Sequence, residues 1–384
     1  MADNKDKKVL NVPALRFPEF TEEWEKCKFG EIATSFDYGM NAAAKPYDGQ
    51  NKYIRITDID ETSSTYNNED VVSPDGTLSE NYMVNERDIL LARTGASTGK
   101  SYLYRKSDGK LYFAGFLIRA NVAEHNPYFV FSQLHTHRYW RWVSIMSARS
   151  GQPGINSQEY ASFPIFTTTL IEENKISTLL SLIDERIATQ NKIIEKLETL
   201  IKGIRHNVFQ QLRKDVGFNS TIGDILSFEQ PQRYIVSSTE YSDDSSCTPV
   251  LTANKAFILG YTTETDGIYS KGDCIIIDDF TLDCKYVSFP FKIKSSAIKI
   301  LTAENKYILR FIYEYLKSLD ISTEEHKRHY ITEIQPSSCI LPDDKTLTTI
   351  ALMFESITNK LENEQSLALM LNKQKQYLLS KMFI

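Results

Sequence analysis

The sequence predicts an α+β protein with two mixed α/β domains in a pseudo-two-fold arrangement, joined by two long helices that form an antiparallel coiled coil. Three observations lead to this fold class. Residues 176–187 match residues 350–361 in their apolar positions, at an offset of 174 residues. Both copies continue with apolar residues spaced alternately by four and three. Strand patterns dominate the remainder of each half.

Length and composition indicate a folded cytoplasmic protein of two or more domains. The chain has 384 residues, of which 41% are hydrophobic and 24% charged, and a single core rarely serves that length. No apolar run approaches the roughly 18 residues that a membrane span needs. Residues 1–8 are polar and charged, so we expect no secretory signal and no membrane contact.

The cysteine content and the net charge say little about which partners the protein binds. The five cysteines are widely spaced and form no C-x-x-C pair, which predicts reduced thiols and no metal site. His135 and His137 flank Thr136, but a third metal ligand is not evident. The net charge of −6 argues mildly against a nucleic acid, although phosphate binding depends on where the charges lie.

The repeat sets the expected boundaries. The first domain, first helix, second domain and second helix are expected, in that order, at residues 1–169, 170–214, 215–343 and 344–384. Looser matches support the duplication, and they pair residues 29–32 with 222–225, residues 87–91 with 272–276, and Pro164 with Pro342.

Each domain is expected to be an α+β unit. Alternating patterns predict strands over residues 52–59, 117–122, 273–277 and 296–301. Helices are expected after them, over residues 128–142 and 305–319.

The two terminal segments carry the spacing of a coiled-coil seam. The first has no Pro between Glu172 and Leu212, and its length of about 40 residues corresponds to about 60 Å of helix. Because a lone amphipathic helix cannot bury its stripe, we expect the two helices to pair, antiparallel if the halves are related by a two-fold axis. The alternative is that each helix packs on its own domain. The seam residues are Ile183, Ile187, Gln190, Ile194, Leu197, Ile201, Ile204 and Val208, and then Ile357, Leu361, Glu364, Ala368, Leu371, Lys375, Leu378 and Met382.

The string R-T-G-A-S-T-G-K-S at residues 93–101 resembles a nucleotide-binding loop but departs from it. Only three residues separate Gly95 from Gly99 where the phosphate loop needs four. Residues 102–105 continue as a strand, whereas a phosphate loop is followed by a helix. We therefore expect a β-hairpin, with an ATPase as the less favoured interpretation. Its polar residues suit base edges and phosphates, and they are Arg93, Thr94, Ser97, Thr98 and Lys100.

Each half also contains an acid-free stretch with basic residues, which is typical of a surface that binds a polyanion. The stretch over residues 125–158 interleaves them with Tyr139, Trp140 and Trp142. Its basic residues are His135, His137 and the DNA-binding candidates Arg138, Arg141 and Arg149. The stretch over residues 284–303 contributes Lys285, Lys292, Lys294 and Lys299. Ordinary solvated charge is the alternative for either stretch alone.

Motifs of nucleic-acid enzymes are missing from the sequence. The string at residues 126–129, Asn-Pro-Tyr-Phe, lacks the second proline of the motif that holds a flipped base. There is no G-x-G-x-x-G and no nuclease-type set of acids. We therefore expect a protein that binds and does not catalyse, without a cofactor in this chain.

Four strings in the chain resemble the DNA-specificity subunits of type I restriction-modification systems. They are residues 13–20 with Trp24 soon after, residues 88–96, residues 151–156, and residues 183–187 at the start of the long helix.

The resemblance implies two target-recognition domains, each reading one half of a split sequence in double-stranded DNA. The helices would set the gap between the halves and help to hold two methyltransferase subunits. Two translocase-nuclease subunits would complete the complex, and S-adenosylmethionine, ATP and Mg would belong to these partners. It also adds Gln152 and Asn156 to the DNA-binding candidates.

The second half departs from the family pattern. Residues 278–280, Asp-Asp-Phe, stand where the first half has Arg93, Thr94 and Gly95, and residues 326–330 replace the Gln-Pro-Gly string. The two domains are therefore expected to read different half-sites, with Lys327 and Arg328 as candidates in the second. The rival interpretation is a coiled-coil scaffold that joins proteins without reading DNA.

Overall fold

The computed structural model describes residues 10–148, 152–253, 256–319 and 328–384. The chain divides into two compact units, of which unit 1 is Met1–Gln190 with Leu367–Ile384 and unit 2 is Asn191–Ser366. Each unit combines antiparallel sheet with helices and includes part of both long helices. The predicted mixed α/β class with two long helices is confirmed.

Unit 1 is built on a four-stranded antiparallel sheet in the order β2-β9-β6-β7. These strands are Ala33–Tyr38, Leu117–Val122, Asp88–Ala92 and Ser101–Leu103. Because successive side chains of a strand point to opposite faces, Ile89 and Leu91 pack against the helices while Leu90 and Ala92 pack on the other side. The helices on the first face are α2, Pro127–Gln133, and α3, His137–Met146.

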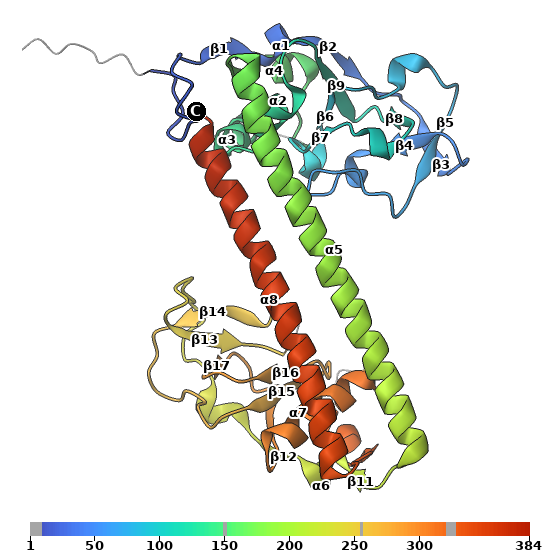
Figure 1. The fold of residues 1–384 in the computed structure, drawn as a ribbon, viewed down its shortest axis with the longest axis vertical. Helices are drawn as coiled ribbons and strands as arrows, with labels where there is room; N and C mark the ends of the chain where they lie inside the picture. The colour runs from blue at the N-terminus through green and yellow to red at the C-terminus, as the bar shows by residue number, and fades with distance from the viewer. Residues whose placement is uncertain (1–9, 149–151, 254–255, 320–327) are drawn as a thin grey trace, which may run out of the picture. The chain divides into compact units, whose positions relative to one another are not determined.

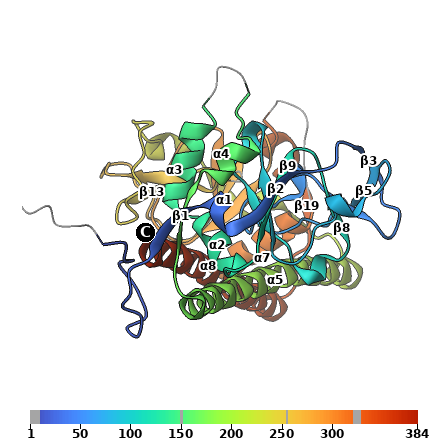
Figure 2. The same cartoon turned by 90° about the horizontal axis from the view of Figure 1, so that it is seen from above.

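Shorter elements complete unit 1. The parallel pair β4 and β8, Lys52–Ile54 and Leu111–Phe113, covers the second face of the sheet. The short helix α1, Phe29–Ile32, lies beside β1 and β2 in Figure 2. The remaining elements are β1 Glu25–Lys28 paired with β10 Pro164–Thr167, β3 Ala43–Pro46 paired with β5 Val72–Asp75, α4 Ser157–Ala161, and 3-10 turns at Ile56–Asp58, Glu80–Tyr82, Gly95–Ser97 and Lys106–Asp108.

Unit 2 repeats this plan. Its four-stranded sheet has the order β12-β18-β15-β16, formed by Ser227–Glu229, Ile298–Thr302, Cys274–Asp278 and Cys284–Val287. Helix α7, Lys306–Ser318, packs on the face that carries Ile275 and Ile277. The other elements are β11 Ser220–Thr221 paired with β19 Ser338–Cys339, α6 Ile222–Ile225, the sheet β14-β13-β17 of Ile258–Thr262, Thr248–Leu251 and Lys292–Ile293, a 3-10 turn at Pro231–Tyr234 and a π-helical turn at Tyr330–Ile334.

The predicted internal duplication is visible in the elements, with one change of register. Residues 29–32 and 222–225 both form the short helix that precedes the first sheet strand. The sequence match of residues 87–91 with 272–276 paired Ile89 with Cys274. In the structure Ile89 corresponds instead to Ile275, because both side chains face the helices of their unit while Cys274 faces the other side of the sheet. A shift of one residue reverses every side chain of a strand, so burial decides between the two alignments.

Other sequence expectations shift at the boundaries. The predicted helix over residues 128–142 is two helices, because Thr136 caps a new one by accepting a hydrogen bond from the Tyr139 N–H. The predicted strand over residues 52–59 ends at Ile54 and continues as a 3-10 turn. Ser338 in β19, and not Pro342, occupies the place that Pro164 has in β10.

The long helices are α5, Leu170–Asp215, and α8, Asp344–Met382, drawn green and red in Figure 1. In unit 1, Ile176 and Leu180 cluster with Leu379 and Met382. Further along α5, Ile183 faces residues 367–374. Partner numbers fall as α5 numbers rise, so this pair is antiparallel.

Unit 2 shows the same direction of pairing. Glu198 and Gln365 approach at 3.5 Å, and the rings of Phe209 and Phe354 stack with centroids 6.5 Å apart. Leu212 belongs to the same cluster as Leu347. The predicted pairing of the two helices is confirmed within each unit.

The predicted seam residues are all buried or half-buried, from Ile183 to Val208 in α5 and from Ile357 to Met382 in α8. The two charges that interrupt the second copy are paired. Lys375 Nζ lies 2.6 Å from Asp184 Oδ1 in α5, and Glu364 pairs with Lys360 on its own helix. The seam therefore tolerates Lys375 because α5 supplies a carboxylate.

The string at residues 13–20 fastens the ends of both long helices in unit 1. Arg16 donates two hydrogen bonds to the buried Glu172 carboxylate, at 2.6 and 2.7 Å, and Trp24 Nε1 donates a third at 3.3 Å. The Leu15 N–H donates to the Lys381 carbonyl of α8 at 2.8 Å. The string that carries the family resemblance thus has a structural role.

Within the described parts of the chain, no helix is long and apolar enough to cross a membrane.

Candidate nucleic-acid interface

The loop of residues 93–100 connects β6 to β7 in an antiparallel hairpin, as predicted. It does not stand free. Thr94 bridges to Gly154, the Gly95 N–H donates to the Pro153 carbonyl at 3.0 Å, and the Ile155 N–H donates to the Arg93 carbonyl at 2.9 Å. Two strings about 60 residues apart in sequence therefore form one surface, which the sequence alone did not bring together.

Two fully buried tyrosines hold the base of this loop. The Tyr160 hydroxyl donates to the Ala92 carbonyl at 2.6 Å and accepts from the Gly99 N–H at 3.2 Å. The Tyr139 hydroxyl donates to the Gly99 carbonyl at 2.8 Å. Burial raises the pKa of both phenols, so they stay protonated and keep donating at neutral pH.

Gly99 fits this arrangement for steric reasons. Its φ is +95°, and a Cβ there would lie 2.8 Å from Val143 Cγ1 and 3.0 Å from Trp140 in α3. A larger residue would strain the backbone and push the loop away from α3.

Arg93 is half-buried and stacked. Its guanidinium carbon lies 4.8 Å from the centre of the Tyr38 ring, and Nη1 donates to the Gly115 carbonyl at 3.4 Å. The Tyr38 hydroxyl accepts a hydrogen bond from the Ser157 N–H at 3.2 Å. Hydrogen bonding with Ser157, aided by the Arg93 charge, lowers the pKa of Tyr38. Arg93 is thus presented on a fixed aromatic platform.

The other polar residues of the loop differ in accessibility. Thr98 is buried, and its hydroxyl donates to the Gly95 carbonyl at 2.8 Å, so it supports the loop from within. Thr94 and Ser97 are half-buried, and Lys100 Nζ lies 2.6 Å from the exposed Glu61 carboxylate. The loop is therefore a broad, buttressed surface.

The basic residues of the first acid-free stretch divide into core and surface. Arg138 stacks on Phe166 and Phe163 at 4.7 and 5.3 Å, and burial lowers its pKa to about 10. His135 bonds to the Phe131 carbonyl and the Ser64 hydroxyl through its two ring nitrogens. Burial lowers the pKa of His135 to about 4, so it is neutral at pH 7.

Among the described residues of α3, the exposed basic side chains are His137 and Arg141. Arg149 lies outside the described residues. Gln152 is exposed beside the loop, whereas Asn156 caps α4 by accepting from the Glu159 N–H at 2.9 Å.

Unit 2 builds the corresponding contact from different side chains. The His329 N–H donates to the Asp279 carbonyl at 2.9 Å, and the Tyr330 N–H donates to Asp279 Oδ1 at 2.9 Å. The first of these bonds matches the one between the Ile155 N–H and the Arg93 carbonyl in unit 1, so Asp279, and not Asp278 as the sequence match placed it, corresponds to Arg93. Arg328 is exposed beside this contact and Lys285 is half-buried in β16, while Lys327 lies outside the described residues.

The second basic stretch is not the open patch that the sequence suggested. Lys299 is buried against Asp279 at 3.4 Å and donates to Gln230 at 2.8 Å. Lys292 is buried against Glu264 at 2.7 Å. Both acids lie outside the stretch, so an acid-free window does not exclude neutralisation by residues distant in sequence. Lys294 is exposed.

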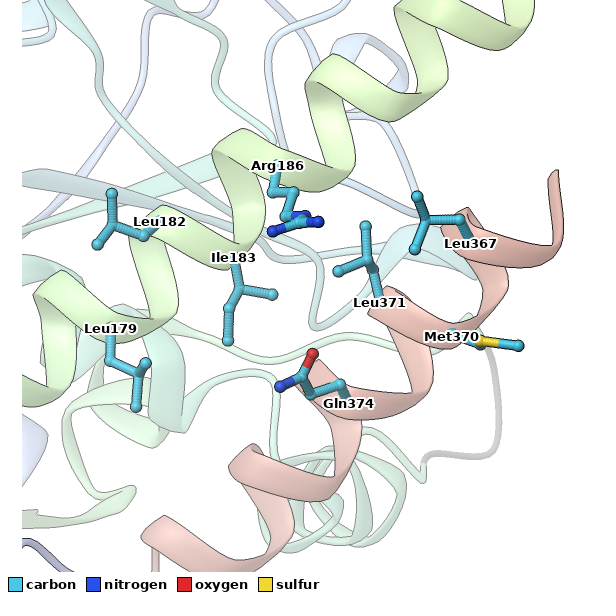
Figure 3. A pocket seen from close by; sticks show the side chains of 8 residues that line it. All are labelled: Leu179, Leu182, Ile183, Arg186, Leu367, Met370, Leu371 and Gln374. Carbon is cyan, nitrogen blue, oxygen red and sulfur yellow. The ribbon is translucent and has the colours of Figure 1, made fainter. Parts of the chain in front are cut away.

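A shallow apolar groove of about 460 Å³ lies between α5 and α8 in unit 1 (Figure 3). Leucines, Ile183 and Met370 line it, and Arg186 and Gln374 add polar atoms. In the described part of the chain no group of three or more His, Cys, Asp or Glu is placed to hold a metal ion.

The sequence indicated neither Tyr38 nor Tyr160, and it gave Tyr139 only as an aromatic residue of the first basic stretch. Tyr38 is 55 positions from Arg93 and meets it only because β2 lies next to β9 and β9 next to β6. No local pattern signals such a contact.

The chain thus has two related α/β units, each of which includes part of two paired long helices. The model of the type I restriction modification DNA specificity domain matches residues 21–199. The type I restriction enzyme EcoR124I/EcoR124II specificity subunit of Escherichia coli is 41% identical over 143 residues. That match covers 35% of this chain and 35% of the curated relative.

Solved structures share the fold. The crystal structure of a type I restriction-modification S subunit from M. genitalium has a TM-score of 0.69 at 16% identity, covering 97% of this chain and 99% of that one. A second, from work on complex assembly and conformational transition of the type I R-M system, has a TM-score of 0.51 at 14% identity, covering 94% and 97%. Residues 21–199 therefore match the DNA specificity domain of type I restriction-modification systems, as the motifs predicted, and the solved S subunits share the fold.

Proposed function

We propose that this chain is the sequence-specific DNA-recognition subunit of a type I restriction-modification complex. Each unit reads one half of a split target in double-stranded DNA. The observation that carries the proposal is the buttressed loop of unit 1, where Arg93 stacks on Tyr38 beside the exposed Gln152. Arginine and glutamine are the side chains that bond guanine and adenine edges in the major groove.

The equivalent surface in unit 2 supports separate half-sites. It keeps the backbone contact between the hairpin and the following segment but replaces Arg93 by Asp279 and Gly154 by Arg328. Because Asp279 is buried against Lys299, the exposed donor that this surface offers is Arg328, and a different set of donors favours different bases. Exposed Arg141 and Lys294 would add phosphate contacts and a salt-dependent part of the affinity.

The chain itself is proposed to be non-catalytic. Methyl transfer with S-adenosylmethionine, and translocation and cleavage with ATP and Mg, would belong to two methyltransferase and two translocase-nuclease subunits. The apolar groove of unit 1, with Leu182 57% and Met370 65% exposed, offers a surface on the paired helices for a methyltransferase subunit.

The direct test is to produce the chain with its methyltransferase partner and map methylation in the host genome. We expect a split motif whose methylation disappears when this gene is deleted. A contiguous motif, or methylation that does not depend on the gene, would contradict the proposal.

Variants separate DNA reading from scaffolding. Arg93→Ala together with Lys100→Ala should lower DNA affinity by ten-fold or more, on the scale of about 1–3 kcal/mol for a base contact, while complex assembly is retained. Lys106→Ala controls for the loss of a positive charge elsewhere in unit 1. Lys106 is exposed on the 3-10 turn after β7 and pairs with Glu86. Unchanged DNA affinity in the double variant would favour the scaffold.

The spacer role has its own test. Adding one heptad to α5 and one to α8 lengthens the helices by about 10 Å, which corresponds to roughly three base pairs at 3.4 Å each. The gap in the methylated motif should grow accordingly. A motif with an unchanged gap would show that the helices do not set it.

A further inference from the structure

Phe116 is exposed at a tight turn between β8 and β9. The Leu117 N–H donates to the Ala114 carbonyl at 2.8 Å and closes the turn, and the Phe116 side chain is 60% exposed. Turn positions usually carry Gly, Asn, Asp or Ser. Phe116 also packs into none of the hydrophobic clusters of the described residues. Neither the turn nor the core accounts for a phenylalanine at this place.

The turn lies directly beside the Arg93 platform. The Arg93 N–H donates to the Phe116 carbonyl at 3.0 Å, and Arg93 Nη1 donates to the Gly115 carbonyl at 3.4 Å. Gly39, directly after β2, allows the chain to pass close to this turn, because a Cβ at Gly39 would lie only 2.2 Å from the Ala114 carbonyl oxygen. Phe116 and Arg93 are therefore fixed neighbours on one surface.

The corresponding residue of unit 2 is small. There the Asp279 N–H donates to the Ala297 carbonyl at 2.8 Å, in the way that Arg93 donates to Phe116. The fold thus does not require an aromatic residue at this position, and the difference coincides with the exchange of Arg93 for Asp279. Both differences lie where the two units are proposed to read different half-sites.

We infer that Phe116 is a specificity-determining residue, which packs on the methyl group of a thymine next to the base pair that Arg93 contacts in the first half-site. The inference rests on the proposed function. Thymine is the base that presents an apolar group in the major groove, and phenylalanine is among the side chains that contact it. A rigid Arg and Phe pair would then recognise a polar edge and a methyl group on adjacent base pairs.

The experiment measures DNA affinity of the full chain assembled with its methyltransferase subunits. Each thymine of the two half-sites, on either strand, is replaced in turn by deoxyuridine, which lacks only the methyl group. The wild type should lose about four-fold in affinity at one thymine, the value of one buried methyl group. That thymine should lie in the half-site whose binding Arg93→Ala weakens.

Phe116→Ala completes the cycle. It should bind the unmodified duplex more weakly, and the deoxyuridine substitution should cost it nothing further, whereas Phe116→Leu should keep part of the sensitivity. Tyr47→Ala removes another exposed aromatic side chain of unit 1 and should leave the deoxyuridine effect unchanged.

Three results would overturn the inference. They are a wild type indifferent to every deoxyuridine, an equal loss in Phe116→Ala, or weaker binding of methyltransferase subunits by Phe116→Ala, which would assign the side chain to a protein interface. If the wild-type complex does not bind the DNA motif that genome mapping identifies, this result contradicts the proposed function itself.

Discussion

The Tyr160 hydroxyl lies 2.6 Å from the Ala92 carbonyl oxygen, so a residue of α4 holds the end of β6 where the loop of residues 93–100 begins. The same hydroxyl accepts from the Gly99 N–H at the other end of the loop. Tyr160→Phe removes both bonds of this hydroxyl, although the Gly99 N–H keeps its 3.0 Å bond to the Ala92 carbonyl. We expect the free energy of unfolding to fall by about 0.5–1.5 kcal/mol, and the affinity for the first half-site to fall as well, measured by denaturation and DNA titration.

A matched control is Tyr315→Phe in unit 2, where the hydroxyl donates to the Ser338 carbonyl at 3.0 Å. It should cost similar stability without changing discrimination at the first half-site. Equal effects of both variants on that half-site would show that Tyr160 acts only through general stability.

Arg16 and Glu172 form a buried, bidentate ion pair, with side-chain exposures of 9% and 0%. Arg16→Met leaves the Glu172 charge buried without its cation, which should cost about 3–5 kcal/mol. The double variant Arg16→Met with Glu172→Met should recover much of this loss. Urea denaturation checks both, and a double variant as unstable as the single one would contradict this account.

His125 gives unit 1 a pH-dependent contribution. Its Nδ1 lies 2.8 Å from the buried Glu173 carboxylate, and the hydrogen bond to Glu173 raises the pKa of His125. Because the folded pKa is above the unfolded value of about 6.5, this stabilisation is complete below about pH 6.5 and is lost as pH rises through the folded pKa. His125→Gln should be less stable than the wild type in acid, with the gap narrowing toward alkaline pH.

Arg138 and Arg141 separate packing from surface charge. Arg138→Ala removes a guanidinium that stacks on two phenylalanines and should lower the free energy of unfolding by about 2 kcal/mol. Arg141→Ala, at an exposed position, should change stability by less than about 0.5 kcal/mol. If Arg141 contacts a phosphate, its loss should reduce the salt slope of DNA binding by about 1. A salt slope that changes only with Arg138 would reverse these assignments.

Much of the helical architecture was predictable from periodicity. The four-three spacing of apolar residues identified the seam of both long helices. In a coiled coil an apolar residue recurs on average every 3.5 residues on the side that faces the partner helix. Strand positions such as residues 117–122 followed from alternation in the same way. Boundaries were less accurate where one side chain decides them, as Thr136 does by capping α3.

The candidate site was predictable only in part. The polar loop at residues 93–100 was evident, but its contact with residues 153–155 was not, and neither was Tyr38 beneath Arg93. The second basic stretch was misread, since Glu264 and Asp279 neutralise Lys292 and Lys299 from outside it.

The sequence by itself determined the duplication, the paired helices and the family resemblance, because these depend on local periods and short strings that recur along one chain. The tertiary structure decided which polar residues remain on the surface and which support it. Arg93 and Arg138 are both half-buried and stacked on aromatic rings, yet Arg93 lies in a surface loop on Tyr38 and Arg138 lies against two buried core phenylalanines. That difference arises from contacts between strands and helices distant in sequence, which no local pattern encodes.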